Sequence, residues 1–134
     1  MTLLKDDRLE IRTPNDVVLV RQVVRTWAIE VGFSLVDQTK MVTAASELAR
    51  NTLDYGGGGT LRLEAIRDGN RRGLRLIFED QGPGISDLER AMTDGYTTGR
   101  GLGMGLSGAR RLVNEFAIDS RVGQGTRVMI TRWK

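Results

Sequence analysis

A glycine-rich run at residues 99–108 (GRGLGMGLSG) constrains this chain more than any other stretch. Half of its residues are glycine, and apolar residues at helical spacing follow it. Glycine has no Cβ atom and tolerates positive φ, so such a loop can bring its amide N–H groups close to a ligand. A helix N-terminus adds unpaired donors and a partial positive charge, which together favour phosphate. The run therefore predicts a phosphate-binding loop, although glycine runs also occur in plain connecting loops.

The chain has 134 residues, which is enough for one domain with a single core. We expect one domain over residues 1–134, with residues 1–7 flexible. The sequence contains neither cysteine nor histidine, which excludes disulfides, zinc–thiolate sites and histidine-based catalysis. No apolar run is long enough to span a membrane, and the first residues lack the apolar core of a signal peptide. These features favour a cytoplasmic protein without a membrane partner.

Basic residues outnumber acidic ones slightly, giving a formal net charge of +3. Most of them are scattered, but four arginines cluster near the tip of a predicted hairpin: Arg67, Arg71, Arg72 and Arg75. A nucleic-acid-binding protein would concentrate such charge on one face, with aromatic residues interleaved. We interpret the cluster as a solvated basic edge, with an acidic protein partner or nucleic acid as the alternatives.

Hydrophobic periodicity predicts the element order β-α-α-β-β-α-α-β-β. This order favours an α/β two-layer sandwich, with helices on one face of a mixed, mostly antiparallel sheet. Capping signatures mark helix starts at Thr13 and Ser34, and Gly32 ends the first helix. The expected strands cover residues 9–12, 61–66, 74–80, 118–122 and 126–133. The expected helices begin near residues 14, 35, 86 and 106, the last with an apolar stripe that extends to Phe116.

Two predicted elements carry polar side chains beside their apolar faces. Glu47 and Asn51 lie one turn apart on the second helix, at the margin of its buried side. Asp80 has the same parity as the apolar residues of its strand and extends their face, where a carboxylate needs a partner. The alternative interpretations are a solvated Glu/Asn pair and an Asp that bonds to the backbone of the turn at residues 81–84.

Residues 103–108 match the dinucleotide fingerprint G-x-G-x-x-G but lack its context. That fingerprint directly follows a strand and needs an acidic residue about 20 residues later, within a βαβ unit. Here a polar loop precedes it, and the P-loop and protein-kinase catalytic-loop motifs are both absent. These nucleotide-binding classes are therefore excluded.

Four separated motifs resemble, in the correct order, the motif set of the GHKL ATPase/kinase superfamily. They lie at residues 47–51 (ELARN), 80–84 (DQGPG), 101–105 (GLGMG) and 123–126 (GQGT). Any one of them would be a weak signal, but the ordered set of four is specific. The resemblance covers about residues 34–133 and implies the Bergerat ATP-binding fold, with ATP and Mg²⁺ as cofactors.

The resemblance also implies a role for each motif residue. Asp80 would accept a hydrogen bond from the adenine amino group, with Thr126 beside it to assist. Asn51 would ligate Mg²⁺ through its carbonyl oxygen, and Glu47 would act as general base towards the attacking hydroxyl. The glycines would bring the backbone close to the nucleotide: Gly82 and Gly84 at the base, and Gly101, Gly103 and Gly105 at the phosphates.

Within the superfamily, the sequence is most similar to the RsbT-like switch kinases of bacterial partner-switching (stressosome) pathways, with anti-sigma-factor kinases as related proteins. Residues 46–51 (SELARN) and 79–85 (EDQGPGI) carry this likeness. It implies a serine/threonine kinase that acts on STAS-domain antagonist proteins and, once released, binds and activates a metal-dependent serine/threonine phosphatase. The alternatives are an anti-sigma-factor kinase, whose partner is a sigma factor, and a nucleotide-binding interaction switch with little turnover.

One position departs from the pattern of sensor histidine kinases. Those proteins usually carry a lysine four residues after the magnesium-binding asparagine, and this chain has Tyr55 there. It also has no histidine that could accept a phosphoryl group. Both features argue against a histidine-kinase fragment.

Overall fold

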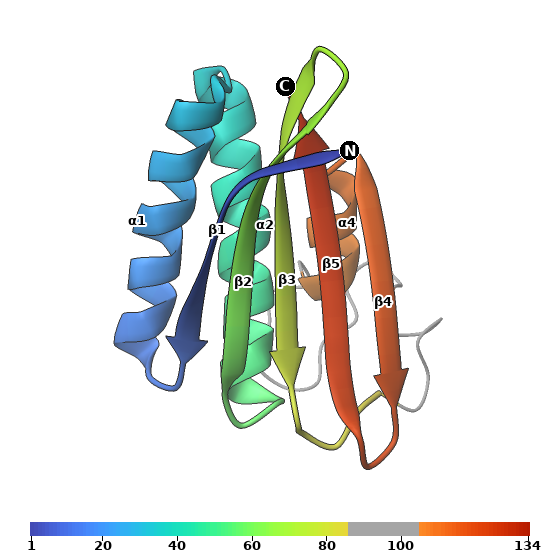
Figure 1. Cartoon of the computed structure of the whole chain (residues 1–134). Helices are drawn as coiled ribbons and strands as arrows, with labels where there is room; N and C mark the ends of the chain where they lie inside the picture. Colours follow the sequence, from blue (N-terminus) through green and yellow to red (C-terminus); the bar gives the residue numbers. More distant parts are fainter. Residues whose placement is uncertain (86–104) are drawn as a thin grey trace.

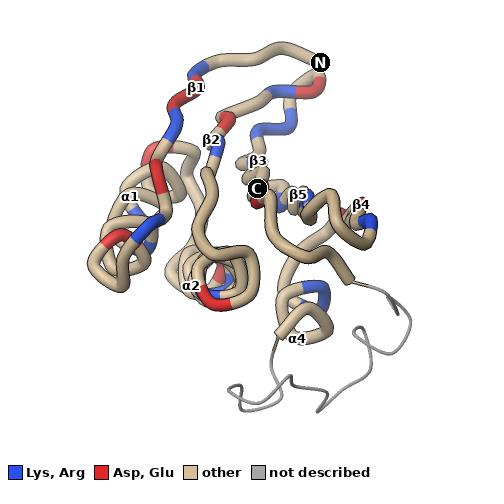
Figure 2. Tube along the Cα trace, turned by 90° about the horizontal axis from the view of Figure 1, so that it is seen from below, with Lys and Arg blue, Asp and Glu red and all other residues tan. Residues whose placement is uncertain are grey.

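The computed structural model describes residues 1–85 and 105–134, which form two layers (Figure 1). Among them, five strands pair in the order β1-β2-β3-β5-β4, and every neighbouring pair is antiparallel. The helices lie together on one face of the sheet (Figure 2). The elements are β1 (Thr2–Ile11), α1 (Pro14–Val31), α2 (Leu35–Asp54), β2 (Gly59–Asp68), β3 (Arg71–Asp80), α4 (Gly105–Arg111), β4 (Glu115–Arg121) and β5 (Gly125–Trp133). The predicted two-layer sandwich is confirmed, with an antiparallel sheet.

The predicted capping residues begin both long helices. The Thr13 hydroxyl accepts a hydrogen bond from the Asp16 amide, and the Asp16 carboxylate accepts one from the Thr13 amide. At the start of α2 the Ser34 hydroxyl accepts from the Asp37 amide at 3.2 Å. Gly32 ends α1 with φ 101°, a left-handed conformation that glycine adopts without strain. These caps fix the α1–α2 connection to a short turn.

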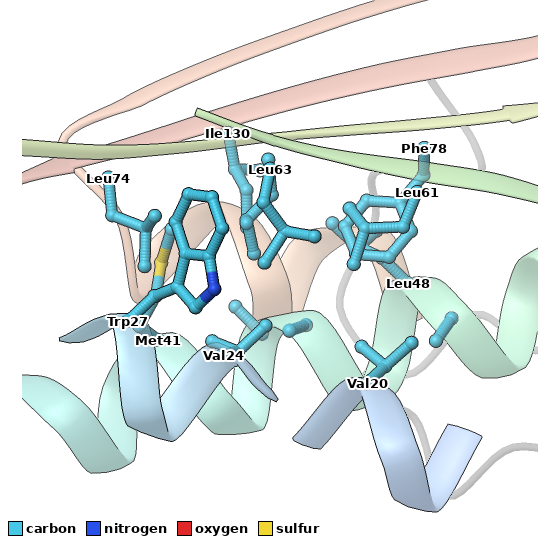
Figure 3. Close-up of a cluster of buried hydrophobic side chains, with 14 of the residues drawn as sticks. Val20, Val24, Trp27, Met41, Leu48, Leu61, Leu63, Leu74, Phe78 and Ile130 are labelled. Carbon is cyan, nitrogen blue, oxygen red and sulfur yellow. The ribbon is translucent and has the colours of Figure 1, made fainter. Parts of the chain in front are cut away.

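The core lies between the helices and the sheet (Figure 3). Strand side chains alternate between the two faces, so every second residue of a strand points toward the helices. Both layers contribute large apolar side chains that are buried: Val20, Val24 and Trp27 from α1, Met41 and Leu48 from α2, and Leu61, Leu63, Leu74, Phe78 and Ile130 from the strands. The hydrophobic effect from this interface is the main force that holds the two layers together.

The N-terminus differs from the expectation of a flexible segment at residues 1–7. β1 begins at Thr2 and pairs with β2 along its whole length, with a register irregularity between Leu3 and Lys5. Lys5 also pairs with Glu30 at 3.1 Å and lies over the Trp27 ring at 4.3 Å. This segment is held by backbone pairing with β2 and by contacts with α1, although its side chains are exposed.

The C-terminal half of the chain corrects the expected helix and strand boundary. α4 ends at Arg111, and Phe116 belongs to β4 rather than to the helical stripe. Phe116 pairs with Ile130, and the Asn114 amide donates to the Thr131 carbonyl at 3.0 Å. Residues 112, 113 and 116 match helical spacing, while 116, 118 and 120 equally match strand alternation. Pairing with β5 decides in favour of the strand. The helix expected from residue 86 lies outside the described residues.

Charged side chains of both signs are interspersed along β1 and β2 (Figure 2). The arginine cluster at the β2–β3 hairpin is partly neutralised: Arg75 lies 3.7 Å from Glu64 and donates to the Thr131 hydroxyl. Arg71 lies near Asp68 and over the Trp133 ring, 4.1 Å from its centroid. This arrangement agrees with a solvated basic edge. Among the described helices, none has the length and apolarity needed to cross a membrane.

Candidate functional site

The predicted base-binding residues lie at one end of the sheet, on the face that carries the helices. Asp80, the last residue of β3, pairs with Thr126 of β5, and Thr126 pairs with Ser120 of β4. On its other side Asp80 pairs with Gly59, the first residue of β2. The backbone register therefore aligns Ser120, Thr126, Asp80 and Gly59 in one row across four strands. We call these four residues the polar row.

Asp80 is the charged member of the polar row and is only partly exposed to solvent. Its Oδ1 atom accepts a hydrogen bond from the Gly82 amide at 2.8 Å. Burial raises the pKa of Asp80, and hydrogen bonds from the Gly82 and Thr126 amides oppose this shift. The turn interaction considered for Asp80 is thus present. It leaves the carboxylate free to bind more, since an ionised carboxylate has about four acceptor positions.

The other two predicted polar residues, Glu47 and Asn51, lie near the C-terminal end of α2 and are both partly exposed. The Glu47 carboxylate has the Arg50 guanidinium 3.7 Å away. The backbone carbonyl of Asn51 accepts hydrogen bonds from the Tyr55 and Gly56 amides, which ends the helix. The side chain of Asn51 takes no part in this cap. Both side chains are therefore held on a rigid helix, one turn apart.

Gly56 brings the end of α2 against the end of β3. A Cβ atom at Gly56 would lie 2.4 Å from both Cβ and Cγ of Asp80. A Cβ atom at Gly82 would lie 2.7 Å from the Gly56 Cα. Real side chains do not make such short contacts, so only glycine permits this approach. The helix with Glu47 and Asn51 and the strand with Asp80 thus meet at one place.

The loop after β3 packs against the β4–β5 turn through a further glycine. Gly84 has φ 76°, and a Cβ atom there would lie 2.2 Å from the Arg121 carbonyl. The Pro83 carbonyl accepts the Gly123 amide at 2.8 Å. At Gly125 φ is 94°, and a Cβ atom would lie 2.1 Å from the Asp80 carbonyl. Gly82 and Gly84 are therefore both close to other backbone segments of the protein, and their approach to a nucleotide base stays a prediction.

The structure describes only part of the predicted phosphate loop. Gly101 and Gly103 lie outside the described residues. Gly105 is the first residue of α4, with φ 34°, and α4 packs against α2. Its position connects the glycine-rich run to the helix that carries Glu47 and Asn51.

The sequence interpretation missed two residues of this site. Ser120 was placed only within the strand expected over residues 118–122, and Gly56 lay outside every expected element. Ser120 shares the parity of Phe116 and Ile118, so a polar residue at the end of an apolar alternation was the available signal. For Gly56 the sequence held no such signal, because its need arises from contact with Asp80 across the fold.

Comparisons with known proteins agree with this geometry. Residues 36–134 match the family described as Histidine kinase-, DNA gyrase B-, and HSP90-like ATPase. The serine/threonine-protein kinase RsbT of Bacillus subtilis is 46% identical over 125 residues, which cover 93% of this chain and 94% of that protein. An anti-sigma F factor of Thermoanaerobacter is 29% identical over 119 residues, covering 84% of this chain and 82% of that protein.

A solved structure shows the same fold. The crystal structure of the RsbU and RsbW domains of a Mycobacterium tuberculosis protein superposes with a TM-score of 0.66 at 24% identity. The match covers 97% of this chain and 33% of that longer one. The predicted fold, family and enzyme class, an ATP-dependent protein serine/threonine kinase, are confirmed by these comparisons. The chain belongs to the GHKL ATPase family, the histidine kinase-, DNA gyrase B- and HSP90-like ATPases.

Proposed function

We propose that this chain is a cytoplasmic kinase that transfers phosphate from ATP to a serine or threonine of STAS-domain antagonist proteins, in a bacterial partner-switching pathway. The observation that carries the proposal is the position of Asp80, a partly buried carboxylate beside Thr126, where the end of α2 meets the sheet. The 46% identity to RsbT, a serine/threonine kinase, supports serine or threonine as the residue that receives the phosphate.

Asp80 would recognise the base of ATP. An adenine amino group is a donor, and an ionised carboxylate in a partly buried site is a strong acceptor for it. The Gly82 and Thr126 amides hold the carboxylate in place and leave acceptor positions for the base. Thr126 would assist from the neighbouring strand, and Gly82 and Gly84 would let the loop pass close to the base. Gly101, Gly103 and Gly105 would bind the phosphates with backbone amides.

Asn51 would hold Mg²⁺ together with the phosphates of ATP. Among residues 1–85 and 105–134, no group of three or more acidic side chains is arranged to bind a metal ion. Mg²⁺ commonly binds few protein oxygens and completes its shell with substrate phosphates and water. The amide oxygen of Asn51, on the partly exposed side of α2, fits this mode. The ion would supply charge neutralisation at the transferred phosphoryl group.

Glu47 would act as the general base. Its carboxylate would take the proton of the serine or threonine hydroxyl as that oxygen bonds to the γ-phosphorus of ATP. The bond from the γ-phosphorus to its bridging oxygen then breaks, and ADP leaves. The Arg50 guanidinium near Glu47 is itself more than half exposed, so it can move aside without a large desolvation cost.

The test of this proposal is phosphorylation of a purified STAS-domain partner with Mg-ATP. Glu47→Gln should lower the rate by about 10²- to 10⁴-fold, the usual contribution of a general base, with ATP affinity retained. Glu30→Gln is the matched control, because Glu30 is an exposed carboxylate on α1 that forms an ion pair with Lys5, outside the proposed site. An unchanged rate in Glu47→Gln would show that the general base is another group. Failure of the native chain to bind ATP would refute the proposal as a whole.

We further propose that the released kinase binds and activates a metal-dependent serine/threonine phosphatase. The sequence resemblance to RsbT-like switch kinases implies this partner, and the anti-sigma F factor relatives support a sigma factor as the alternative. Asn51→Ala should abolish phosphorylation through loss of Mg-ATP binding. If phosphatase activation survives in Asn51→Ala, the chain is an interaction switch whose output does not require turnover. Stable binding to a sigma factor in place of the phosphatase would favour the anti-sigma-factor alternative.

A further inference from the structure

Arg132, near the end of β5, joins three elements through one guanidinium group. Its Nη2 atom donates to the Asp37 carboxylate at 2.7 Å, and its Nη1 atom donates to the Leu112 carbonyl at 2.8 Å. Asp37 lies in the first turn of α2, and Leu112 directly follows α4. The Arg132 side chain is only 14% exposed. One partly buried cation therefore links β5, the start of α2 and the end of α4.

The predicted site residues of these three elements lie toward their opposite ends. α2 begins and β5 ends at the same end of the molecule, away from the polar row (Figure 1). Along the helix axes, roughly 21 Å separate Asp37 from Asn51, and roughly 10 Å separate Leu112 from Gly105. α4 packs against α2, with its end tied to the first turn of α2. Gly105 therefore lies toward the later turns of α2, which carry the proposed metal and base residues.

A directional contact is needed to fix the position of α4. α4 has seven residues, and a helix of this length depends on packing for its stability. Apolar contacts attract without a preferred direction, whereas a hydrogen bond fixes both distance and angle. The Asn114 amide and side chain bond to the backbone of Thr131 and Trp133, which holds the α4–β4 connection to β5. The guanidinium of Arg132 adds a link to α2, the helix that carries the proposed chemistry.

Stability alone does not account for an arginine at this position. The Arg132 Nε atom is buried and has no hydrogen-bond partner among the described residues, which is unfavourable. A buried ion pair is often no more stable than apolar residues in its place. The guanidinium group does offer a rigid fork that holds two acceptors in fixed geometry, which a lysine ammonium group cannot do. The value of Arg132 therefore lies in the geometry that it fixes.

We propose that Arg132 is a positioning residue for phosphoryl transfer, which holds the end of α4 against the start of α2. It thereby sets where Gly105, at the phosphates, stands relative to Glu47 and Asn51. This inference rests on the proposed function, because it requires the phosphates of ATP at Gly105. Arg132 acts through α4 rather than on the substrate. The base-binding end of the site, at Asp80, does not depend on this link.

The experiment measures three quantities on the full chain: the Kd for Mg-ATP, the Kd for adenosine and the kcat with a purified STAS-domain partner. Adenosine has the base without the phosphates, so its Kd reports the base-binding end alone. Arg132→Lys keeps the charge but cannot hold both acceptors. It should raise the Kd for Mg-ATP about tenfold, the size of one hydrogen bond to a charged group, with the Kd for adenosine unchanged. The kcat should fall by about 10- to 100-fold, because small misplacements of reacting groups are costly.

Arg75→Lys is the matched control. Arg75 is also a partly buried arginine, 18% exposed, with Glu64 and the Thr131 hydroxyl as its partners. It alternates along β3 with residues that face the helices, so its side chain points to the other face of the sheet. This variant should leave the kcat and both Kd values unchanged.

A double variant, Asp37→Asn with Arg132→Met, separates positioning from stability. It removes both charges of the ion pair, so thermal unfolding should show little loss of stability. The kcat and the ratio of the two Kd values should still change as in Arg132→Lys, because the Leu112 carbonyl loses its donor. If the double variant does not fold, Arg132→Lys decides alone.

Three results would overturn the inference while leaving the proposed function intact. They are native values in Arg132→Lys, an equal loss of affinity for Mg-ATP and adenosine in that variant, and recovery of native kcat in the double variant. Absence of ATP binding by the native chain would overturn the proposed function together with this inference.

Discussion

Two adjacent rows of side chains cross the same face of the sheet and have opposite chemistry. The polar row contains Ser120, Thr126, Asp80 and Gly59. Two residues further along the same strands, the neighbouring row is entirely apolar, and we call it the apolar row: Ile118, Val128, Phe78 and Leu61. Phe78 and Leu61 are almost fully buried, whereas Asp80 and Thr126 are partly exposed. On the same face of the same four strands, a shift of two residues therefore separates the hydrophobic core from the candidate site.

The fold limits the free-energy cost of placing a partly buried carboxylate at the polar row. Two members of the apolar row, Leu61 and Phe78, point into the space between the sheet and the helices α1 and α2 (Figure 3). At the polar row, glycines replace side chains: Gly59 stands beside Asp80 in the sheet, and Gly56 lies against Asp80 from the end of α2. Without those side chains, backbone amides reach Asp80 and solvent remains close by. The packed strands thus fix the position of the polar row, and the neighbouring glycines leave room for its charged side chain.

The largest expected effect is a loss of stability caused by a substitution in the apolar row. Phe78→Ala removes a buried ring between β2 and β5 and should lower the free energy of unfolding by about 3 to 5 kcal/mol. Urea unfolding followed by circular dichroism measures this loss. Phe78 belongs to the apolar row and not to the residues proposed to contact ATP. The ATP affinity of the fraction that remains folded should therefore fall far less than the stability. A loss of ATP binding at full stability would contradict the division between the rows.

Asp80→Asn should give the reverse pattern. Loss of the charged acceptor should raise the Kd for ATP by roughly 10- to 100-fold, the size of a hydrogen bond to an ionised group. Stability at neutral pH should be kept or slightly increased, because burial disfavours the ionised form of Asp80 in the native state. Calorimetry with Mg-ATP and thermal unfolding on the same samples test both parts. Glu79→Gln is the matched control, as Glu79 is the exposed neighbour on the opposite face. A stability loss comparable to that of Phe78→Ala would show that Asp80 is mainly structural.

Much of this contrast could be predicted from sequence, and the remainder has a clear physical reason. Strand alternation placed Asp80 on the core face, and helical spacing placed Glu47 beside Asn51, because both are local periodicities. The partnership of Ser120 with Thr126 depends on the register of two strands, which no local pattern specifies. The boundary at Phe116 was missed because helical and strand periods coincide there. Long-range contacts, rather than propensities, decide such positions.

Gly56→Ala should produce an intermediate effect on both properties. The added Cβ atom would lie 2.4 Å from the Asp80 side chain and 2.6 Å from the Thr52 carbonyl, so the end of α2 or Asp80 must shift. Overpacking of this kind costs about 1 to 3 kcal/mol of stability, and the displaced carboxylate should also weaken ATP binding. Gly57→Ala is the control: φ there is 72° with open space around it, so it strains the backbone without touching Asp80. Equal ATP affinities in the two variants would argue against the contact between Gly56 and Asp80 as a determinant of the site.

The smallest effect is a difference in the pH dependence of stability between the polar row and the α1 cap. The folded-state pKa of Asp80 is raised by burial, so its contribution to stability is fully present below the unfolded value of 3.8 and is lost as pH rises through the folded pKa. The pKa of Asp16 is lowered, chiefly by the hydrogen bond from the Arg12 amide, so its contribution is present above 3.8 and is lost as pH falls through the folded pKa. Thermal unfolding of the native chain and of both variants should be measured from acid to neutral pH. Asp80→Asn should lose the decrease in stability that occurs as pH rises above 3.8, and Asp16→Asn should lose the decrease that occurs as pH falls below 3.8. ATP affinity should also fall as Asp80 is protonated, because a neutral carboxyl is a weaker acceptor for the amino group of the base. If Asp80→Asn leaves the pH profile above 3.8 unchanged, Asp80 is too hydrated to serve as the buried acceptor of the polar row.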